Sequence, residues 1–320
     1  MKNVKKPIIF VFLGLFSPAL ALMLRLCSAV NTRLPSEALA KDGLKGFLER
    51  SKISFNKFRM SARTHICMYY YCTVFLVLIF TANTYCLIIE SNTLETVLDY
   101  ITPHTLVIFD IDNTLARPAQ ELSSDEWFCH LVNTKMAEGH DYITSIYYAL
   151  PATYYAQFNV ALQATEISAA SLIAGLIDHS IPTMALTTRS LFVSERTFVQ
   201  LEDINIHFLA PDISQDDLVL PMPHPCFYKN SILFSGNNDK GEALITFFHW
   251  MNYYPKKVVF IDDKMKYLLA VEKALKHYNI EFVGIRYAGC DDRVQTFDPA
   301  KAESQWRQLR TKKYIEKEEI

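Results

Sequence analysis

The chain has 320 residues, of which 50% are hydrophobic and 21% are charged, and its formal net charge is −2. This composition excludes a disordered or collagen-like protein and leaves room for one large folded domain or two smaller ones. The small net charge is an average over two unlike parts, because residues 1–64 carry 12 basic and three acidic side chains and the remainder is acidic. This distribution favours a membrane surface as the partner of the basic part and disfavours binding to nucleic acid.

Two apolar stretches occupy much of the amino-terminal region. The first covers about residues 7–24, and the second covers about residues 66–89 without a charged side chain, long enough to span a bilayer. The connector between them is basic, whereas the first charge after the second stretch is Glu90. By the positive-inside rule, we expect the connector to stay in the cytoplasm and the chain after it to cross the membrane. Residues 1–90 are therefore predicted to be a membrane-targeting region.

Three arrangements of this region are compatible with the sequence. It could form two membrane spans, a single signal-anchor at the second stretch, or a signal peptide that starts functionally near Met60 and is cleaved near Ala82. Both stretches could instead be buried helices of a soluble protein, but the second is longer than globular core helices usually sustain. We favour the second stretch as the exporting element, with the rest of the chain outside the cytoplasm.

From residue 91 onward, short apolar runs alternate with helical segments. A helix is predicted first, over Thr93–Tyr100. Apolar runs typical of buried strands follow at Thr105–Phe109, Thr183–Leu186, Ser231–Phe234, Val258–Ile261 and Phe282–Ile285. Helical spacing predicts further helices over Gly241–Met251 and Lys264–Tyr278. This alternation predicts an α/β fold with a doubly wound, Rossmann-like parallel sheet in three layers.

The interval between the first two predicted strands is too long for a loop. It is rich in aromatic and helix-compatible sequence, so we expect an inserted helical cap over about residues 116–181. The cap would belong to a catalytic domain over residues 91–298. Residues 299–320 are predicted to be a polar carboxyl-terminal tail that ends as a solvated helix.

Acidic residues follow the first predicted strand directly, in the order Asp110-Ile111-Asp112-Asn113-Thr114. Residues two apart in an extended strand point the same way, so Asp110 and Asp112 are expected to present two carboxylates at one strand end. Close carboxylates repel each other, which favours a shared proton or a bound cation. A Mg²⁺ ion would relieve this repulsion and would also bind phosphate oxygens.

Three further strand ends supply complementary groups. Thr187 and Arg189 follow the second predicted strand, Lys240 precedes the helix after the third, and Asp262 and Asp263 follow the fourth. Ligands of doubly wound sheets bind beyond the carboxyl ends of the strands, so these residues are expected to gather at one edge. A nucleophilic carboxylate, a proton carrier, hydroxyl and ammonium donors and metal-binding carboxylates fit phosphoryl transfer.

These motifs resemble, in order, the four motifs of the haloacid dehalogenase-like superfamily. The first, an apolar strand followed by DxDxT, is matched by residues 107–115, the second by Leu186-Thr187, the third by Lys240-Gly241 and the fourth by Ile261-Asp262-Asp263. The resemblance covers roughly residues 105–290 and not residues 1–90. Within the superfamily the chain is similar to a bacterial branch with no assigned substrate. Together with the export predicted from the amino-terminal region, this similarity leads us to expect the catalytic domain in the bacterial periplasm or at the cell surface.

The resemblance implies a Mg²⁺-dependent phosphatase that hydrolyses a small phosphomonoester through an aspartyl-phosphate. It implies that Asp110 attacks phosphorus and that Asp112 protonates the leaving alcohol and then activates water. The implied phosphate-binding residues are Thr187, Lys240, Thr114 and Arg189. The implied metal ligands are Asp110, the backbone carbonyl of Asp112, and Asp262 with Asp263.

Two positions narrow this interpretation. Phosphatases of the superfamily carry an acid at the position of Asp112, whereas its ion-pumping ATPases have a threonine and its dehalogenases lack the acid. Four residues after Asp262, the chain has Lys266 in place of a second carboxylate. We therefore expect the adjacent pair Asp262 and Asp263 to bind the metal ion, and we favour Asp262 as the direct ligand. The alternatives are a phosphotransferase or phosphosugar mutase on the same fold, and a non-catalytic module that binds metal or phosphate.

Overall fold

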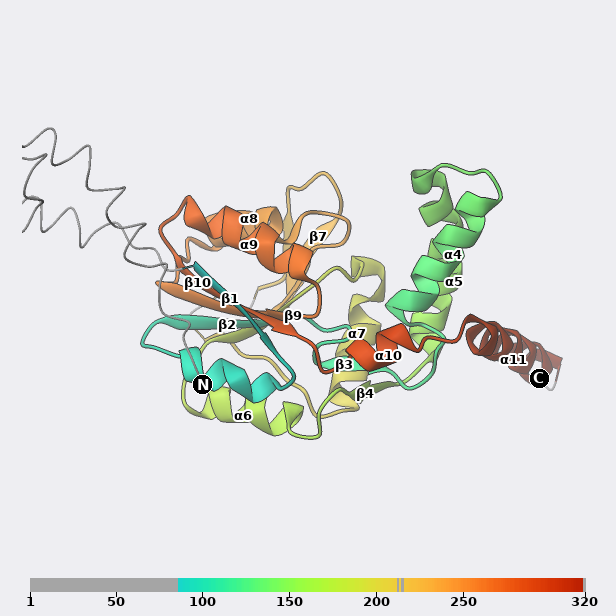
Figure 1. The fold of residues 1–320 in the computed structure, drawn as a ribbon, viewed down its shortest axis with the longest axis horizontal. Helices are drawn as coiled ribbons and strands as arrows, with labels where there is room; N and C mark the ends of the chain where they lie inside the picture. The colour runs from blue at the N-terminus through green and yellow to red at the C-terminus, as the bar shows by residue number, and fades with distance from the viewer. Residues whose placement is uncertain (1–85, 212, 214–215, 319–320) are drawn as a thin grey trace, which may run out of the picture. The chain divides into compact units, whose positions relative to one another are not determined.

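A computed structural model describes residues 86–211, 213 and 216–318 of the chain (Figure 1). These residues belong to one unit, Asn83–Ile320. The first predicted apolar stretch lies outside the described residues, as does the second up to residue 85. Within the part of the chain that the structure describes, every helix is too short or too polar to cross a bilayer.

An eight-stranded sheet forms the centre of the fold, in the order β1-β10-β9-β2-β5-β8-β7-β6. The first six strands in this order are parallel to one another, and β7 and β6 add an antiparallel edge. The strands are β1 (Cys86–Ser91), β2 (Thr105–Phe109), β5 (Thr183–Thr187), β6 (Leu218–Leu220), β7 (Cys226–Lys229), β8 (Ile232–Phe234), β9 (Lys257–Asp262) and β10 (Glu281–Tyr287). From β2 the parallel strands run in chain order to β5 and β8 on one side and to β9 and β10 on the other, as in a doubly wound sheet, and β1 adds a further parallel strand beyond β10.

Helices cover both faces of this sheet. Alternate residues of β2 enter two separate cores, with Val107 in one and Leu106 in the other. The 3₁₀ helix η1 (Leu94–Tyr100) and α6 (Ala169–Asp178) pack into the first core, and α8 (Lys240–Met251) and α9 (Met265–Lys276) pack into the second. Figure 1 shows α8 and α9 on one side of the sheet and α6 on the other. The predicted three-layer α/β architecture is confirmed.

Strand β1 extends the domain beyond its predicted start at residue 91. It lies at the edge of the sheet, where Leu87 pairs with Val283 and Ile89 pairs with Ile285 of β10. Its apolar residues continue the second apolar stretch without a break, so the sequence offered no boundary between the two. The folded domain therefore includes residues 86–90, and the last four residues of the predicted stretch 66–89 are in a strand.

The insertion after β2 is a pair of helices on a two-stranded base. Strands β3 (Ala116–Pro118) and β4 (Leu162–Ala164) pair antiparallel, and α4 (Asp125–Ala137) and α5 (Tyr142–Asn159) project from them, as Figure 1 shows. Ser124 and Asp141 cap the two helices by accepting hydrogen bonds from the backbone. Helix α6 packs against the sheet instead, so the cap spans residues 116–164 and does not extend to residue 181.

The carboxyl-terminal region packs against this insertion. Helix α10 (Asp291–Gln295) is followed by α11 (Pro299–Glu318), in which Ala302 is fully buried. The ring of Trp306 lies 5.5 Å from that of Trp127 in α4 and 5.7 Å from that of Tyr155 in α5. The polar composition concealed these inward-facing residues, so the first part of α11 is not the free solvated tail that the sequence predicted.

Candidate active site

Two carboxylates flank one lysine at the carboxyl ends of β2 and β9. Asp110 follows β2, Asp262 ends β9, and Lys240 is the first residue of α8. Lys240 Nζ donates to Asp110 Oδ1 at 2.5 Å and to Asp262 Oδ2 at 2.8 Å. Carboxylate oxygens of Asp110, Asp262 and Asp263 all lie within 4.8 Å of one another. Four residues predicted from three different motifs are thus brought together, and we refer to them as the carboxylate–lysine cluster.

The close packing of α8 against α9 places Lys240 in the cluster. A Cβ atom on Gly241 would lie 2.3 Å from the carbonyl oxygen of Ala270, so only glycine permits this approach. Asp239 caps α8 by accepting a hydrogen bond from the backbone. The ammonium group of Lys240 is fully buried and lies 4.5 Å from the ring centroid of Tyr267.

Thr114 connects the first motif to the fourth. Its Oγ1 accepts a hydrogen bond from the backbone N–H of Asp263 at 3.0 Å and lies 3.5 Å from Asp110 Oδ2. The side chains of Thr114 and Thr187 are both fully buried, and the hydroxyl of Thr187 accepts a hydrogen bond from the backbone N–H of Arg189. The structure therefore gives both threonine hydroxyls partners within the protein.

The Asp112 carboxylate lies outside the carboxylate–lysine cluster and pairs with Arg189. Arg189 Nε and one terminal nitrogen donate to the two Asp112 oxygens at 2.8 Å each. Strand β2 ends at Phe109, and a turn follows in which Asn113 has a φ of 59°, so the extended backbone assumed for residues 110–112 does not continue. Arg189, a predicted phosphate ligand, is engaged by the protein itself.

Burial has the largest effect on the carboxylates of the cluster, followed by attraction to a lysine and then by repulsion among the carboxylates. Burial raises the pKa of Asp110 to about 7, although Lys240 opposes this rise and the charges of Asp262 and Asp112 add to it. Burial likewise raises the pKa of Asp263 to about 9, and Lys264 opposes that rise. Burial alone would lower the pKa of Lys240, but the neighbouring Asp110 and Asp262 outweigh it and raise this pKa.

The donor set fits a divalent cation. Three carboxylates against one ammonium leave a surplus of two negative charges in the carboxylate–lysine cluster when all are ionised. Oxygen donors of this kind are the ligands that Mg²⁺ prefers in proteins. Burial, to which repulsion among the carboxylates adds, raises the pKa of Asp110 and Asp263, so both groups favour a proton or a cation that removes negative charge.

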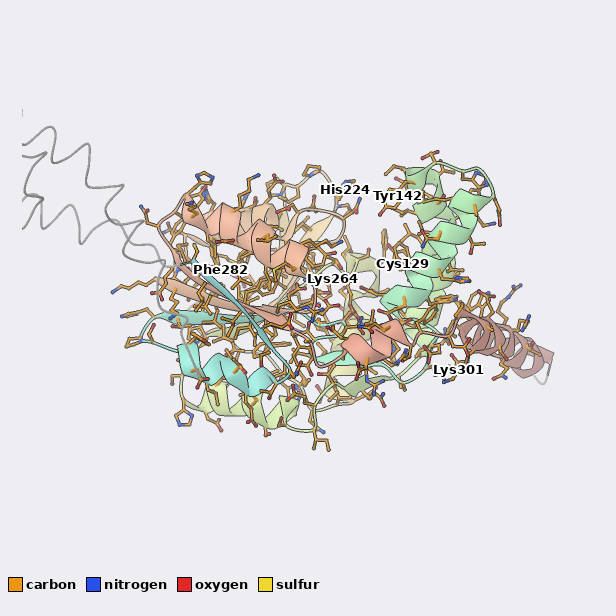
Figure 2. The ribbon with its side chains drawn as sticks, viewed as in Figure 1. Cys129, Tyr142, His224, Lys264, Phe282 and Lys301 are labelled. Carbon is orange, nitrogen blue, oxygen red and sulfur yellow. The ribbon has the colours of Figure 1, made fainter. Side chains whose placement is uncertain are left out.

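The inserted helices contact the motif loops through two polar pairs. Asp125, in the first turn of α4, forms an ion pair with Lys264. Its neighbour Glu126 accepts a hydrogen bond from Asn113 Nδ2 at 3.0 Å. Figure 2 shows Lys264 at the end of the sheet that is turned toward the inserted helices. Burial would raise the pKa of Asp125, but Lys264 outweighs this effect and lowers it.

Sequence reasoning missed several of these partners. Lys264 could have been found because it directly follows the Asp262-Asp263 pair. Asp125 and Gln200 carry no local signal, since each meets the site only after distant segments have packed together. Gln200 Oε1 accepts a hydrogen bond from Arg189 at 2.9 Å, although the residue lies in α7 (Ser194–Glu202), away from every motif.

The fold and the carboxylate–lysine cluster define a doubly wound α/β protein with a buried polar centre at its strand ends. The chain belongs to the family described as "Protein of unknown function (DUF2608)", whose model matches residues 90–320. A protein from Chlamydia muridarum is 25% identical over 200 residues, which cover 62% of this chain and 75% of that protein. A protein from Chlamydia pneumoniae is 22% identical over 237 residues, which cover 70% of this chain and 85% of that one.

Both relatives are named as candidate outer membrane proteins. Among solved structures, a haloacid dehalogenase-like hydrolase from Streptococcus pneumoniae is similar to this chain with a TM-score of 0.34 and 13% sequence identity. The similarity covers 56% of this chain and 93% of that structure.

Proposed function

We propose that this protein is a Mg²⁺-dependent phosphatase that hydrolyses a small phosphomonoester through an aspartyl-phosphate on Asp110. The observation that carries the proposal is the carboxylate–lysine cluster, in which a buried ammonium holds Asp110 beside two further carboxylates. A carboxylate fixed in this way can attack an electrophile along a defined direction, because Lys240 orients one of its oxygens. The order of the four motifs, which resembles that of the haloacid dehalogenase-like superfamily, supports the same reaction.

The chemistry would proceed in two displacements. Asp110 Oδ2 forms a bond to phosphorus while the bond from phosphorus to the ester oxygen breaks. Asp112 would begin this step protonated, on a lone pair that the Arg189 guanidinium does not occupy, and would give that proton to the departing oxygen. A water molecule then attacks the same phosphorus, Asp112 takes a proton from it, and the bond to Asp110 breaks to release inorganic phosphate. Lys240 offsets the charge of the transferring group, and Thr187 would orient it.

Three residues would hold the metal ion, namely Asp110, Asp262 and Asp263, with the backbone carbonyl of Asp112 as a further ligand. When bound, Mg²⁺ would supply positive charge that screens the phosphoryl oxygens from the attacking carboxylate. Lys240 reduces the repulsion among these carboxylates and keeps them together in the absence of an ion.

The inserted helices and the amino-terminal region support proposals about substrate and location. Helix α4 contacts Lys264 and Asn113 beside the cluster, so a small phosphorylated metabolite fits the site better than a phosphoprotein. The basic amino-terminal region, its apolar stretches and the names of the chlamydial relatives favour a protein that is exported or anchored to a membrane.

A panel of phosphomonoesters tests the proposed activity on the full-length chain, with either Mg²⁺ or EDTA present. We expect phosphate release from at least one ester with Mg²⁺, and its loss in EDTA and in Asp110→Asn, which keeps the shape but removes the nucleophilic charge. Full activity of Asp110→Asn would refute the mechanism. Transfer of phosphate to added alcohols would identify a phosphotransferase instead, and Mg²⁺ binding without turnover on any ester would identify a binding module.

A further inference from the structure

We propose that Gln200 and Arg189 are positioning residues that couple the inserted helices to the orientation of the Asp112 carboxylate. This inference rests on the proposed function, in which Asp112 carries the proton. It assigns a role to Gln200, which lies outside all four motifs, and it gives Arg189 a role other than phosphate binding.

The first link joins Asp112 to Arg189. Both Asp112 oxygens accept hydrogen bonds from the guanidinium group, in the two-pronged geometry that fixes a carboxylate in direction as well as in place. The Arg189 side chain is only 3% exposed, so it has little freedom to take another position. The direction of the Asp112 carboxylate therefore follows the position of Arg189.

The second link joins Arg189 to the end of α5 through Gln200. The remaining terminal nitrogen of Arg189 donates to Gln200 Oε1 at 2.9 Å and to Thr197 Oγ1 at 3.1 Å. Gln200 Nε2 donates to the backbone carbonyls of Gln157 at 2.9 Å and Val160 at 2.8 Å. The last carbonyls of a helix have no partner within the helix, so Gln200 satisfies groups that would otherwise lack one.

The amide of Gln200 has one orientation that suits these neighbours. Its oxygen faces a guanidinium, which only donates, and its nitrogen faces two carbonyls, which only accept. Gln200 is 1% exposed, so water cannot replace either set of partners without a cavity opening. A displacement of the α5 end must therefore break buried hydrogen bonds or shift Arg189, and with it Asp112.

The same insertion is tied to the site at its other end, where α4 contacts Lys264 and Asn113. The start of α4 thus contacts the loops that follow β2 and β9, and the end of α5 contacts Gln200 in α7. The α5 end is linked to the proposed proton carrier by a continuous chain of buried hydrogen bonds through Gln200 and Arg189. We expect Asp112 to be correctly aimed only while α5 holds the position described here.

Two substitutions of Gln200 separate the two links. Gln200→Glu keeps an acceptor for Arg189 but replaces the donors to the α5 carbonyls with an oxygen that repels them. Gln200→Met removes the hydrogen bonds to both Arg189 and the α5 carbonyls while keeping a side chain of similar size. Gln157→Ala is the matched control, because Gln200 binds the backbone oxygen of residue 157, which alanine retains.

The experiment compares kcat/KM of the full-length chain, with Mg²⁺, for two probes. 4-Nitrophenyl phosphate releases a stable phenolate that needs no proton, whereas glycerol phosphate releases an alkoxide that does. Because kcat/KM reports the steps up to the first loss of alcohol, it senses proton delivery by Asp112 separately from water activation. Both Gln200 variants should lose about tenfold or more on glycerol phosphate and less than about twofold on 4-nitrophenyl phosphate, and Gln157→Ala should keep the wild-type ratio.

The outcomes separate this inference from the proposed function. Equal losses on both probes would show a structural role alone and would overturn the coupling, as would an unchanged ratio in a folded Gln200 variant. Turnover of only the aryl probe by the wild-type chain would overturn it too, because Asp112 would then deliver no proton. Failure of the wild-type chain on both probes and on the wider panel would refute the proposed function and this inference together. If Gln200→Met does not fold, Gln200→Glu decides.

Discussion

Replacing Lys240 with methionine should destabilise the fold strongly in the absence of metal. The ammonium group is fully buried and donates to Asp110 and Asp262, whose side chains are 7% and 0% exposed. Removing one partner of a buried ion pair costs about 3–5 kcal/mol, because the remaining charges are left uncompensated. With a urea m-value of about 3 kcal/mol/M, this loss lowers the unfolding midpoint by roughly 1–1.7 M.

Urea unfolding of residues 83–320 in EDTA, followed by circular dichroism, measures this effect. Lys266→Met is the control, since Lys266 is exposed, and it should stay within about 0.5 kcal/mol of wild type. Mg²⁺ should restore part of the lost stability in Lys240→Met, because the variant leaves three carboxylates without a cation. A free energy of unfolding within about 1 kcal/mol of wild type in EDTA would refute the view that Lys240 holds the cluster together.

Two other measurements test the surroundings of Lys240, and a glycine in α6 serves as the control for the second. The free energy of unfolding in EDTA should fall as the pH rises from about 5 to about 9, because the folded chain keeps protons on Asp110 and Asp263 that the unfolded chain has released. A free energy of unfolding that does not change with pH would contradict these raised pKa values. Mg²⁺ should make the free energy of unfolding depend less steeply on pH. Gly241→Ala should cost about 1–3 kcal/mol in thermal or urea unfolding, since its Cβ would meet the backbone of Ala270, and an unaffected variant would show that α8 and α9 can separate cheaply. Gly175→Ala, in an open position of α6, should instead stabilise by about 0.4–1 kcal/mol.

The buried strands could be predicted from the sequence because their signal is local. Residues Thr105–Phe109 form β2 with the predicted bounds, since all five are buried and an acidic turn follows. The same signal failed for β1, whose apolar residues merge with the preceding stretch. The antiparallel edge of β6 and β7 also escaped prediction, because these strands are short and only partly buried.

Some contacts of the candidate site could also be predicted from the sequence, and others could not. Asp110, Lys240 and Asp262 could be predicted to meet because the carboxyl ends of parallel strands share one edge of the sheet. The partner of Asp112 could not, because Arg189 is 77 residues away and the direction of the Asp112 carboxylate depends on a turn that extended-strand geometry does not describe. The packing of α11 on the insertion could not be predicted either, because it depends on a few apolar residues within a sequence whose average composition is polar.

The pairing of β1 with β10 bears on when this domain can finish folding. Cys86 lies opposite Phe282 at the start of that pair, so the first described strand has no place in the sheet until almost the whole chain is available. Contacts between residues so far apart in sequence form slowly, because a long loop must close before they can contribute. Strand β1 would thus stay without its partner strand while later segments are synthesised. Any expressed fragment that begins at residue 91 would lack most of β1 and leave β10 as an uncovered sheet edge prone to aggregation.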